Sequence, residues 1–252
     1  LPLVEKNPTD VQGATLPPSR RTDAMLPRDV VGVAQTGSGK TLAYALPILQ
    51  YILENTAHSQ DPARSLEALV LTPTRELALQ VCSHIRAVVE AGGCFANVAA
   101  ICGGMSVQKQ ERVLLQHGGA HIVVATPGRL WDMIKHDDAL ALRVRRTRFL
   151  VIDEADRMIE AGHFAEMDLL LQMVRRTKGA AADANPDMQT FVYSATMSKA
   201  LQTNLKRALW RKKQRREAEP STTLDDLLAR VDFRDAEPVV IEMSTQRHVA
   251  DT

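Results

Sequence analysis

The sequence predicts an α/β fold in which helices cover both faces of a mainly parallel, doubly wound sheet. Short apolar runs recur along the chain, with segments of helical periodicity between them. These runs are apolar throughout instead of alternating with polar residues, which is typical of strands buried between two helix layers. Several of them end in a loop that opens a helix, as βα units do.

The elements follow one another in regular alternation. Strands are expected at 29–33, 69–73, 96–101, 122–125, 149–152, 191–193 and 239–241. Helices are expected to start near residues 42 and 128 and to span 74–90, 106–116 and 164–174. Polar loops are expected at 55–65 and 178–187.

Composition is ordinary for a globular domain, with 252 residues, 45% hydrophobic and 24% charged. The net charge of +1 means that any surface for nucleic acid must be local. Three cysteines without metal-ligand spacing favour a reducing compartment. No apolar run approaches the ~20 residues that cross a bilayer, so no membrane partner is expected. The chain begins at Leu1 instead of Met, and we expect a piece of a longer protein.

A glycine-rich loop joins the first strand to the first long helix. Glycines let consecutive backbone N–H groups face one anion, and the helix N-terminus adds its dipole. Lys40 then reaches the β- and γ-phosphates of a nucleotide, and Thr41 holds Mg²⁺. A Gly/Ser turn without a ligand is the alternative. The nucleotide-binding residues are Ala34, where glycine is usual, and Gln35, Thr36, Gly37, Ser38, Gly39, Lys40 and Thr41.

Two acids end the strand at 149–152. In enzymes with such a loop, an acid at the end of a neighbouring strand completes the Mg²⁺ shell, and Asp153 fits this role. Glu154 is placed to orient and polarise the attacking water, because ligands bind at the carboxyl ends of such strands. An acidic helix start, favoured by the helix dipole, is the alternative. We expect Lys40, Asp153 and Glu154 to be catalytic.

Six short motifs follow one another along the chain, at 34–41, 73–77, 103–104, 126–130, 153–156 and 194–196. In order and approximate spacing they resemble those of DEAD-box RNA helicases. The resemblance covers most of 8–243 and implies the first of that family's two RecA-like domains. Residues 157–166, and a basic insert followed by 224–231 and 238–241, most resemble the nucleolar members that act in large-ribosomal-subunit assembly.

The resemblance implies an RNA track on two helix starts, each of which can offer N–H groups and an arginine to a phosphate. Successive phosphates and 2′-hydroxyls of one strand would be held without base reading. For Arg75 and Arg129 taken singly, an exposed charge or an internal ion pair is the alternative. The implied RNA-binding residues are Pro73, Thr74, Arg75, Glu76, Gly103, Gly104, Thr126, Pro127, Gly128 and Arg129.

Further roles also come from the resemblance. Ser194 and Thr196 would hydrogen-bond Asp156 and couple nucleotide state to domain closure, or cap the next helix, or both.

Gln12, in a segment that resembles the family's glutamine motif, would bond the adenine edge. The aromatic expected three residues before Pro8 is Glu5 here. Either Leu3 or Val4 then stacks on the base, or the preference for ATP is loose.

The expected organisation is a glutamine-motif segment (1–28), a RecA-like ATP-binding domain (29–205), a basic insert (206–237), and a last strand with the start of a linker (238–252) to an absent second RecA-like domain. Residues 206–216 carry seven basic residues in eleven. This run is a solvated face, an RNA-phosphate patch, or a nuclear or nucleolar address.

Three functions remain in view. The first is the amino-terminal catalytic half of an ATP-dependent RNA helicase that uses ATP and Mg²⁺, with RNA, the second domain and pre-ribosomal proteins as partners, in the nucleolus or nucleus, with the cytoplasm as alternative. An ATP-gated RNA clamp or assembly scaffold that needs no turnover is the second. A different P-loop enzyme, such as a DNA helicase or nucleotide kinase, is the third. The fragment alone is expected to be weakly active.

Overall fold

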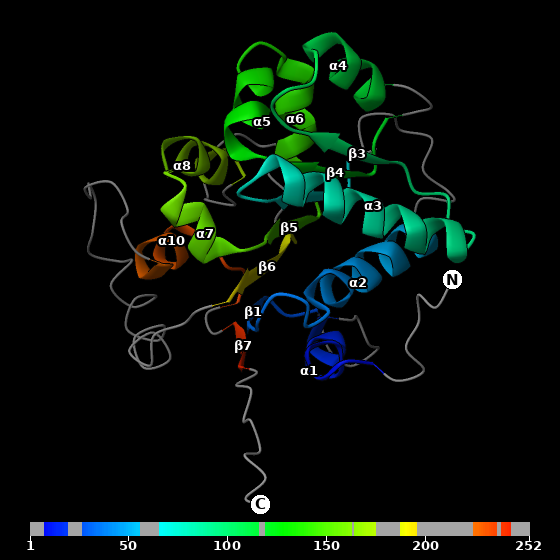
Figure 1. Ribbon diagram of the computed structural model, residues 1–252, viewed down its shortest axis with the longest axis vertical. Helices are drawn as coiled ribbons and strands as arrows, with labels where there is room; N and C mark the ends of the chain where they lie inside the picture. The colour runs from blue at the N-terminus through cyan, green and yellow to red at the C-terminus, as the bar shows by residue number, and fades with distance from the viewer. Residues whose placement is uncertain are drawn as a thin grey trace, which may run out of the picture.

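A parallel sheet organises the part of the chain that the structure describes (Figure 1). In this computed structural model the described residues are 8–19, 27–55, 66–115, 119–162, 164–174, 187–195, 224–235 and 238–242. Among them, seven strands lie in the order β3-β4-β2-β5-β6-β1-β7, and every neighbouring pair is parallel. The strands are β1 (Val30–Val33), β2 (Ala68–Leu71), β3 (Val98–Ile101), β4 (Ile122–Ala125), β5 (Phe149–Ile152), β6 (Gln189–Ser194) and β7 (Val239–Glu242).

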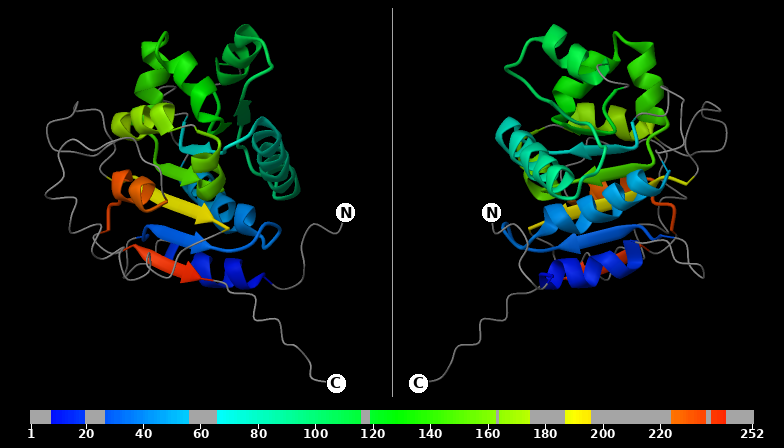
Figure 2. Two further views of the ribbon diagram at one scale, coloured as in Figure 1. Left: turned by 60° about the vertical axis from the view of Figure 1, so that its left-hand side comes forward. Right: turned by 90° about the vertical axis from the view of Figure 1, so that its right-hand side faces the viewer.

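Helices lie on both sides of this sheet, as Figure 2 shows. Their buried side chains fall into two clusters: α1, α2 and α3 share one, whereas α5 to α8 and α10 share the other with Leu114 of α4. The helices are α1 (Asp10–Ser19), α2 (Lys40–Asn55), α3 (Arg75–Ala91), α4 (Val107–Leu115), α5 (Pro127–Ile134), α6 (Asp138–Arg145), α7 (Ala155–Glu160), α8 (Phe164–Met173) and α10 (Leu224–Arg230).

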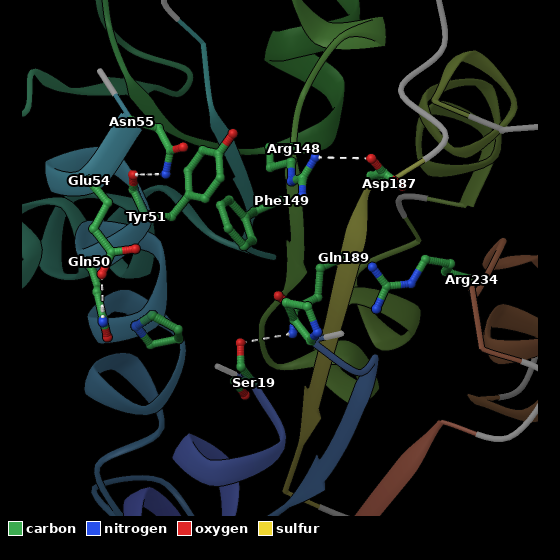
Figure 3. Close-up of a pocket in the computed structure, with 12 residues that line it drawn as sticks. Ser19, Gln50, Tyr51, Glu54, Asn55, Arg148, Phe149, Asp187, Gln189 and Arg234 are labelled. Carbon is green, nitrogen blue, oxygen red and sulfur yellow. Dashed lines mark hydrogen bonds and ion pairs between the residues drawn. The ribbon is translucent and has the colours of Figure 1, made fainter. Parts of the chain in front are cut away.

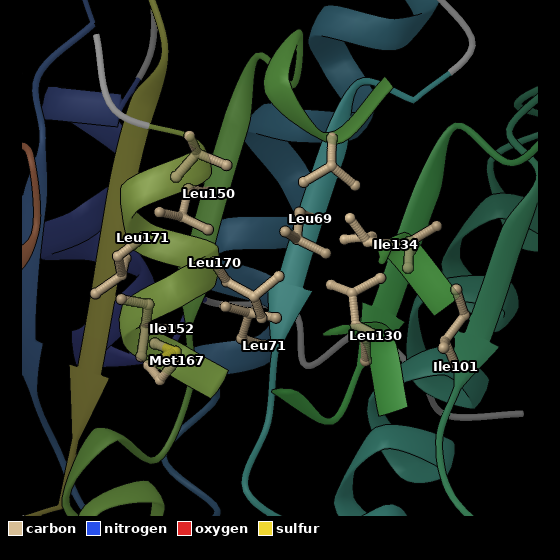
Figure 4. Close-up of a cluster of buried hydrophobic side chains, with 14 of the residues drawn as sticks. Leu69, Leu71, Ile101, Leu130, Ile134, Leu150, Ile152, Met167, Leu170 and Leu171 are labelled. Carbon is tan, nitrogen blue, oxygen red and sulfur yellow. The ribbon is translucent and has the colours of Figure 1, made fainter. Parts of the chain in front are cut away.

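Strand β2 shows why its run is apolar throughout. Successive side chains of a strand point to opposite faces. Accordingly Leu69 and Leu71 join one cluster, while Ala68 and Val70 join the other. Figure 4 shows the two leucines facing Leu130 of α5. All four β2 residues are fully buried, and each buried leucine contributes about 1.5–3 kcal/mol.

The predicted fold class is confirmed, and each of the seven expected strands is present. The expected helices are present too, but α1, α6, α7 and α10 were not predicted from the sequence. Gly13, Pro17 and Pro18 disfavour a helix at α1, which nevertheless forms against α2. For α6 the missed signal was its cap, because the Asp137 side chain accepts a hydrogen bond from the Leu140 N–H at 3.0 Å.

The segment assigned to the basic insert contains a structured part. From Leu224 onward the chain forms α10, and Leu227, Leu228 and Val231 are buried against the sheet. Residues 206–216, which carry the basic run, lie outside the described residues. The helices that the structure describes include none long and apolar enough to span a membrane.

Candidate functional site

The strand order divides the sequence motifs into two groups at one edge of the sheet. The carboxyl ends of β5, β6 and β1 are neighbours, and residues 153–156, 194–195 and 34–41 lie at the ends of these strands. The carboxyl ends of β3, β4 and β2 are neighbours as well, and residues 103–104, 126–130 and 73–77 follow them. Because β2 pairs with β5, the two groups lie side by side.

The glycine-rich loop has the backbone that its glycines permit. Gly37 and Gly39 have φ values of 83° and 90°, which L side chains rarely adopt. Position 39 also has no room for a side chain, because a Cβ there would lie 2.7 Å from both Gln12 Nε2 and Thr9 Oγ1. The loop begins on the sheet, where the Ala34 N–H donates to the Ser194 carbonyl at 3.0 Å.

Lys40 begins α2 and its side chain folds back over the loop. Its Nζ donates to the Ala34 carbonyl at 2.7 Å, and the residue is buried. Ser38 Oγ is also buried and has no hydrogen-bond partner among the described residues. A buried ammonium and an unpaired hydroxyl beside a helix N-terminus are the groups that a triphosphate satisfies, so the residues present fit a nucleotide.

Asp153 lies directly after β5 and is 3% exposed. Its Oδ1 accepts the Glu154 N–H at 2.9 Å, and its Oδ2 accepts the Tyr44 hydroxyl at 3.0 Å. Burial raises the pKa of this carboxyl, and the Tyr44 hydrogen bond and the Lys40 charge partly oppose the shift. The described residues contain no group of three or more His, Cys, Asp or Glu side chains that could hold a metal ion by themselves. The donors fit Mg²⁺ held by one carboxylate, Thr41 and phosphates better than an all-protein cage.

Glu154 has a strained backbone. It has φ 50° and ψ 52°, and it is the one non-glycine among the described residues with positive φ. Such a conformation costs about 1–3 kcal/mol and is concentrated at functional sites. The Glu154 side chain is buried and pairs with the exposed Arg157 at 3.2 Å.

Gln12 lies on α1 against the nucleotide loop. Its Nε2 donates to the Gly39 carbonyl at 3.3 Å, and its Oε1 accepts the Thr9 N–H at 3.1 Å. The side chain is buried. Gln12 therefore contacts the loop itself, which joins α1 to the site. The residues named as possible stacking partners for the base, Leu3 and Val4, lie outside the described residues.

Arg75 and Gly104 come from different motifs and meet in space. A Cβ on residue 104 would lie 1.8 Å from Arg75 Nη1, and Gly104 has φ 78°. Burial raises the pKa of the neighbouring Cys102 thiol, and the charges of Arg75 and Arg129 oppose that shift. Both arginines therefore lie near the loop that follows β3.

Arg129 holds the loop that follows β3 by hydrogen bonds. Its Nη2 donates to the Met105 carbonyl at 2.5 Å, and its Nε donates to Gln110 Oε1 at 2.9 Å. The Gln110 amide in turn donates to the Cys102 carbonyl at 2.7 Å. The guanidinium of Arg129 is thus engaged within the protein by hydrogen bonds to neutral groups, which is neither the exposed charge nor the ion pair considered as alternatives. These contacts hold the loop that carries Gly103 and Gly104.

The starts of α3 and α5, which are expected to contact RNA, differ in how they are capped. Thr74 caps α3, because its side chain accepts the Leu77 N–H at 3.2 Å. Thr126 caps α5 with its backbone alone, and Pro127 occupies the first turn. The first-turn N–H groups of α5 are consequently not engaged by a side-chain cap. Gly128, in the same turn, has no heavy atom within 4 Å of an added Cβ.

The structure describes two of the three residues expected to couple nucleotide state to domain closure. Ser194 ends β6 and pairs in register with Val33, the last residue of β1. Asp156 lies in the first turn of α7, where its Oδ1 accepts the Arg157 N–H at 3.1 Å. The structure thus brings Ser194 to the base of the nucleotide loop. Thr196 lies outside the described residues.

Sequence reasoning missed three residues that hold the site together. They are Tyr44, which contacts Asp153; Gln110, which contacts Arg129; and Arg157, which pairs with Glu154. For Tyr44 a signal existed in the spacing. Tyr44 is three positions after Thr41 and four after Lys40, and residues at these spacings are neighbours on a helix surface. Gln110 gave none, since its partners are distant in sequence.

A pocket of about 160 Å³ lies at the opposite ends of the strands (Figure 3). Phe149 and Gln189, which begin β5 and β6, are among its lining residues. Arg148 lies over the Tyr51 ring at 5.2 Å and pairs with Asp187 at 3.4 Å. Because the sequence motifs follow the carboxyl ends of the strands, this pocket is separate from the site.

Comparison with known proteins defines the class. The family model for DEAD/DEAH box helicases matches residues 9–203, and the chain belongs to this family. The resemblance inferred from the motifs is therefore confirmed.

Particular relatives are also similar. The chain is 38% identical over 246 residues to the ATP-dependent RNA helicase mak5 of Sclerotinia sclerotiorum, covering 94% of this chain and 30% of that protein. It is 38% identical over 251 residues to DEAD-box ATP-dependent RNA helicase 13 of Oryza sativa subsp. japonica, covering 89% and 29%. The solved yeast DEAD-box splicing factor Prp28 is similar with a TM-score of 0.64 at 32% identity, covering 81% of this chain and 44% of that one. The chain spans about a third of the length of the curated relatives.

Proposed function

We propose that this chain is the nucleotide- and RNA-binding half of an ATP-dependent RNA helicase. The observation that carries the proposal is the sheet order, which places two groups of motifs next to each other at the carboxyl ends of the strands. The nucleotide group is residues 34–41, 153–156 and 194–195, and the RNA group is residues 73–77, 103–104 and 126–130. The names of the relatives, which are ATP-dependent RNA helicases, support it.

The nucleotide group supplies the chemistry of phosphoryl transfer. Lys40 and the N–H groups of the loop hold the phosphates, while Gln12 holds the loop through one amide hydrogen and keeps the second for the adenine edge. Thr41 and Asp153 are the residues that would hold Mg²⁺, which neutralises charge on the phosphate oxygens. Glu154 lies beyond Asp153, where its carboxylate can orient a water and accept its proton. Its pairing with Arg157 fixes the side chain near this position.

The RNA group offers a path for a backbone instead of a set of base contacts. Arg75 presents one guanidinium, and the loop that carries Gly103 and Gly104 and the first turn of α5 present backbone N–H groups. All three lie at neighbouring strand ends. Such groups bind phosphates and sugars without reading sequence. We therefore propose a single RNA strand of any sequence as the ligand.

We propose further that turnover requires a second RecA-like domain in a longer parent protein. The P-loop, Asp153 and Glu154 contact the transferring phosphate from one side only, and an arginine from the facing side is typically worth about 10³–10⁵ in rate. Ser194 and Asp156, with Thr196, are the residues proposed to couple the nucleotide to this closure. Local unwinding of short duplexes is a property of the closed, two-domain protein.

The cellular role that we propose is ribosome biogenesis in the nucleolus, with pre-ribosomal proteins as partners. The support is the resemblance of residues 157–166 and of the segments after the basic run to nucleolar helicases of large-subunit assembly. Imaging of the tagged parent protein tests this directly. A purely cytoplasmic signal would contradict it.

The proposed activity is tested by comparing this chain with its parent. We expect the chain to bind Mg²⁺-nucleotide and single-stranded RNA but to hydrolyse ATP poorly at saturating RNA. The parent should be stimulated by RNA and not by DNA of the same sequence. Stimulation by DNA would indicate a different P-loop enzyme, and RNA-stimulated turnover of the fragment equal to that of the parent would refute the two-domain argument.

A further inference from the structure

The phenol of Tyr44 lies between the two residues proposed to hold Mg²⁺. Its hydroxyl donates to Asp153 Oδ2 at 3.0 Å. The same hydroxyl is also within hydrogen-bonding reach of the Thr41 side chain. A phenol carries its proton at neutral pH, so this hydroxyl is a donor to the ionised carboxylate.

The position of this hydroxyl is fixed by packing. Tyr44 is fully buried, and its ring lies against that of Tyr193 with centroids 5.6 Å apart. The Tyr193 ring lies directly over Gly32, where a Cβ would be 2.5 Å from Tyr193 Cε1. A missing side chain in β1 thus lets the two aromatic rings pack against each other at an interplanar angle of 46°. Because Tyr44 is fully buried, this packing restricts the position of its phenol beside Asp153.

The carboxylate is correspondingly fixed at both oxygens. Oδ1 accepts the Glu154 N–H at 2.9 Å, so one donor on each oxygen sets the plane of the group. A carboxylate has about four acceptor positions, and two remain for a cation or its water. Partners that orient a metal-binding side chain in this way typically change metal affinity by about 10–100-fold.

We propose that Tyr44 is a positioning residue for magnesium, whose hydroxyl holds the Asp153 carboxylate in the orientation that receives a Mg²⁺-bound nucleotide. This inference rests on the proposed nucleotide-binding function. The hydroxyl orients the Asp153 carboxylate, whereas the ring only packs against Tyr193.

Two phenylalanine variants of this chain separate the hydroxyl from the ring. Tyr44→Phe removes the donor to Asp153 and keeps the ring contact. Tyr193→Phe is the matched control, because it removes from the adjoining ring a buried hydroxyl whose hydrogen-bond neighbour is Thr15 and not a proposed Mg²⁺ ligand. The probe is a fluorescent ADP analogue, with binding measured as Mg²⁺ is titrated and again in EDTA. Thermal unfolding in EDTA reports the folded state of each variant.

We expect Tyr44→Phe to need about tenfold more Mg²⁺ for half-maximal binding, while its affinity in EDTA matches wild type. Tyr193→Phe should match wild type in both. In an Asp153→Asn background, adding Tyr44→Phe should shift the Mg²⁺ midpoint no further, because the two residues act through one contact. Equal Mg²⁺ midpoints for Tyr44→Phe and wild type, or a full shift retained in the Asp153→Asn background, would overturn the inference. Absence of Mg²⁺-dependent binding in wild type would instead overturn the proposed function.

Discussion

The guanidinium group of Arg75 lies against the backbone of Gly104, so close that a Cβ on residue 104 would meet Nη1 at 1.8 Å. Only glycine accommodates both this contact and the positive φ of residue 104. The helix start after β2 and the loop after β3 are therefore one unit. A side chain at 104 would change the placement of the arginine.

Gly104→Ala should consequently weaken RNA binding. Displacing Arg75 removes a charge-assisted contact of about 1.5–3 kcal/mol, which is roughly a tenfold loss or more in affinity. Anisotropy with a labelled single-stranded RNA measures this. Gly162→Ala is the control, since Gly162 has a similar φ of 74° and an added Cβ there has no heavy atom within 4 Å. Equal affinities of Gly104→Ala and wild type would show that Arg75 does not contact RNA.

Lys40→Ala should reduce the affinity for Mg²⁺-ATP at least tenfold, because the buried phosphates lose their main positive partner. Isothermal titration calorimetry on the chain gives the affinities. Lys135→Ala is a suitable control, because Lys135 is exposed at the end of α5 and pairs with Asp132. The hypothesis fails if both variants bind like wild type.

Glu154→Gln in the parent protein should retain ATP and RNA binding and lose hydrolysis, because an amide cannot accept the proton of water. RNA-stimulated phosphate release measures the loss. Arg157→Gln, which removes the ion-pair partner but leaves the acid, should lower the rate far less. Unchanged turnover in Glu154→Gln would make Glu154 a structural residue. Retained cellular function without turnover would instead favour the clamp or scaffold hypothesis.

His121 should make the fold sensitive to mild acid. Its Nδ1 accepts the Asn97 N–H at 3.0 Å, and burial lowers its pKa below the usual 6.5. The unfolded chain therefore binds the proton first. The stabilisation is complete above pH 6.5 and is lost as pH falls from there toward the lower native pKa.

The effect is small, because the site is partly exposed and solvent screens it. Thermal unfolding of wild type and of His121→Gln between pH 7.5 and 5 measures it, with His84→Gln as control because His84 is exposed. We expect the wild-type Tm to fall more steeply than that of His121→Gln. Parallel curves would contradict this account.

Much of the fold could be predicted because its strands are apolar on both faces. That pattern indicates a parallel sheet without knowledge of strand order, and the glycine loop and the acids mark strand ends where ligands bind. The order itself could not be read from the pattern. The adjacency of Gly104 and Arg75 therefore appeared only in the structure.

The partners of the site residues were hidden for a related reason. The expectation that Gln12 bonds adenine gave no indication that its amide contacts Gly39, 27 residues further along the chain. Arg129 resembles an RNA-binding arginine in sequence, but it is held by Gln110 and the Met105 carbonyl. Spacing along the chain reports which residues follow a strand. It does not report which buried acceptors those residues meet.

The placement of β1 in the sheet also limits the order in which the strands can pair as the chain folds. Strands β2, β3, β4 and β5 all come from residues 68–152, so they can pair as soon as that stretch has been synthesised. Strand β1, at residues 30–33, pairs with residues 191–194 and 239–242. Contacts that close such long loops form late and slow the folding of a chain. A nascent chain that has not reached residue 189 therefore contains the whole phosphate-binding loop but neither of the strands that hold it in place.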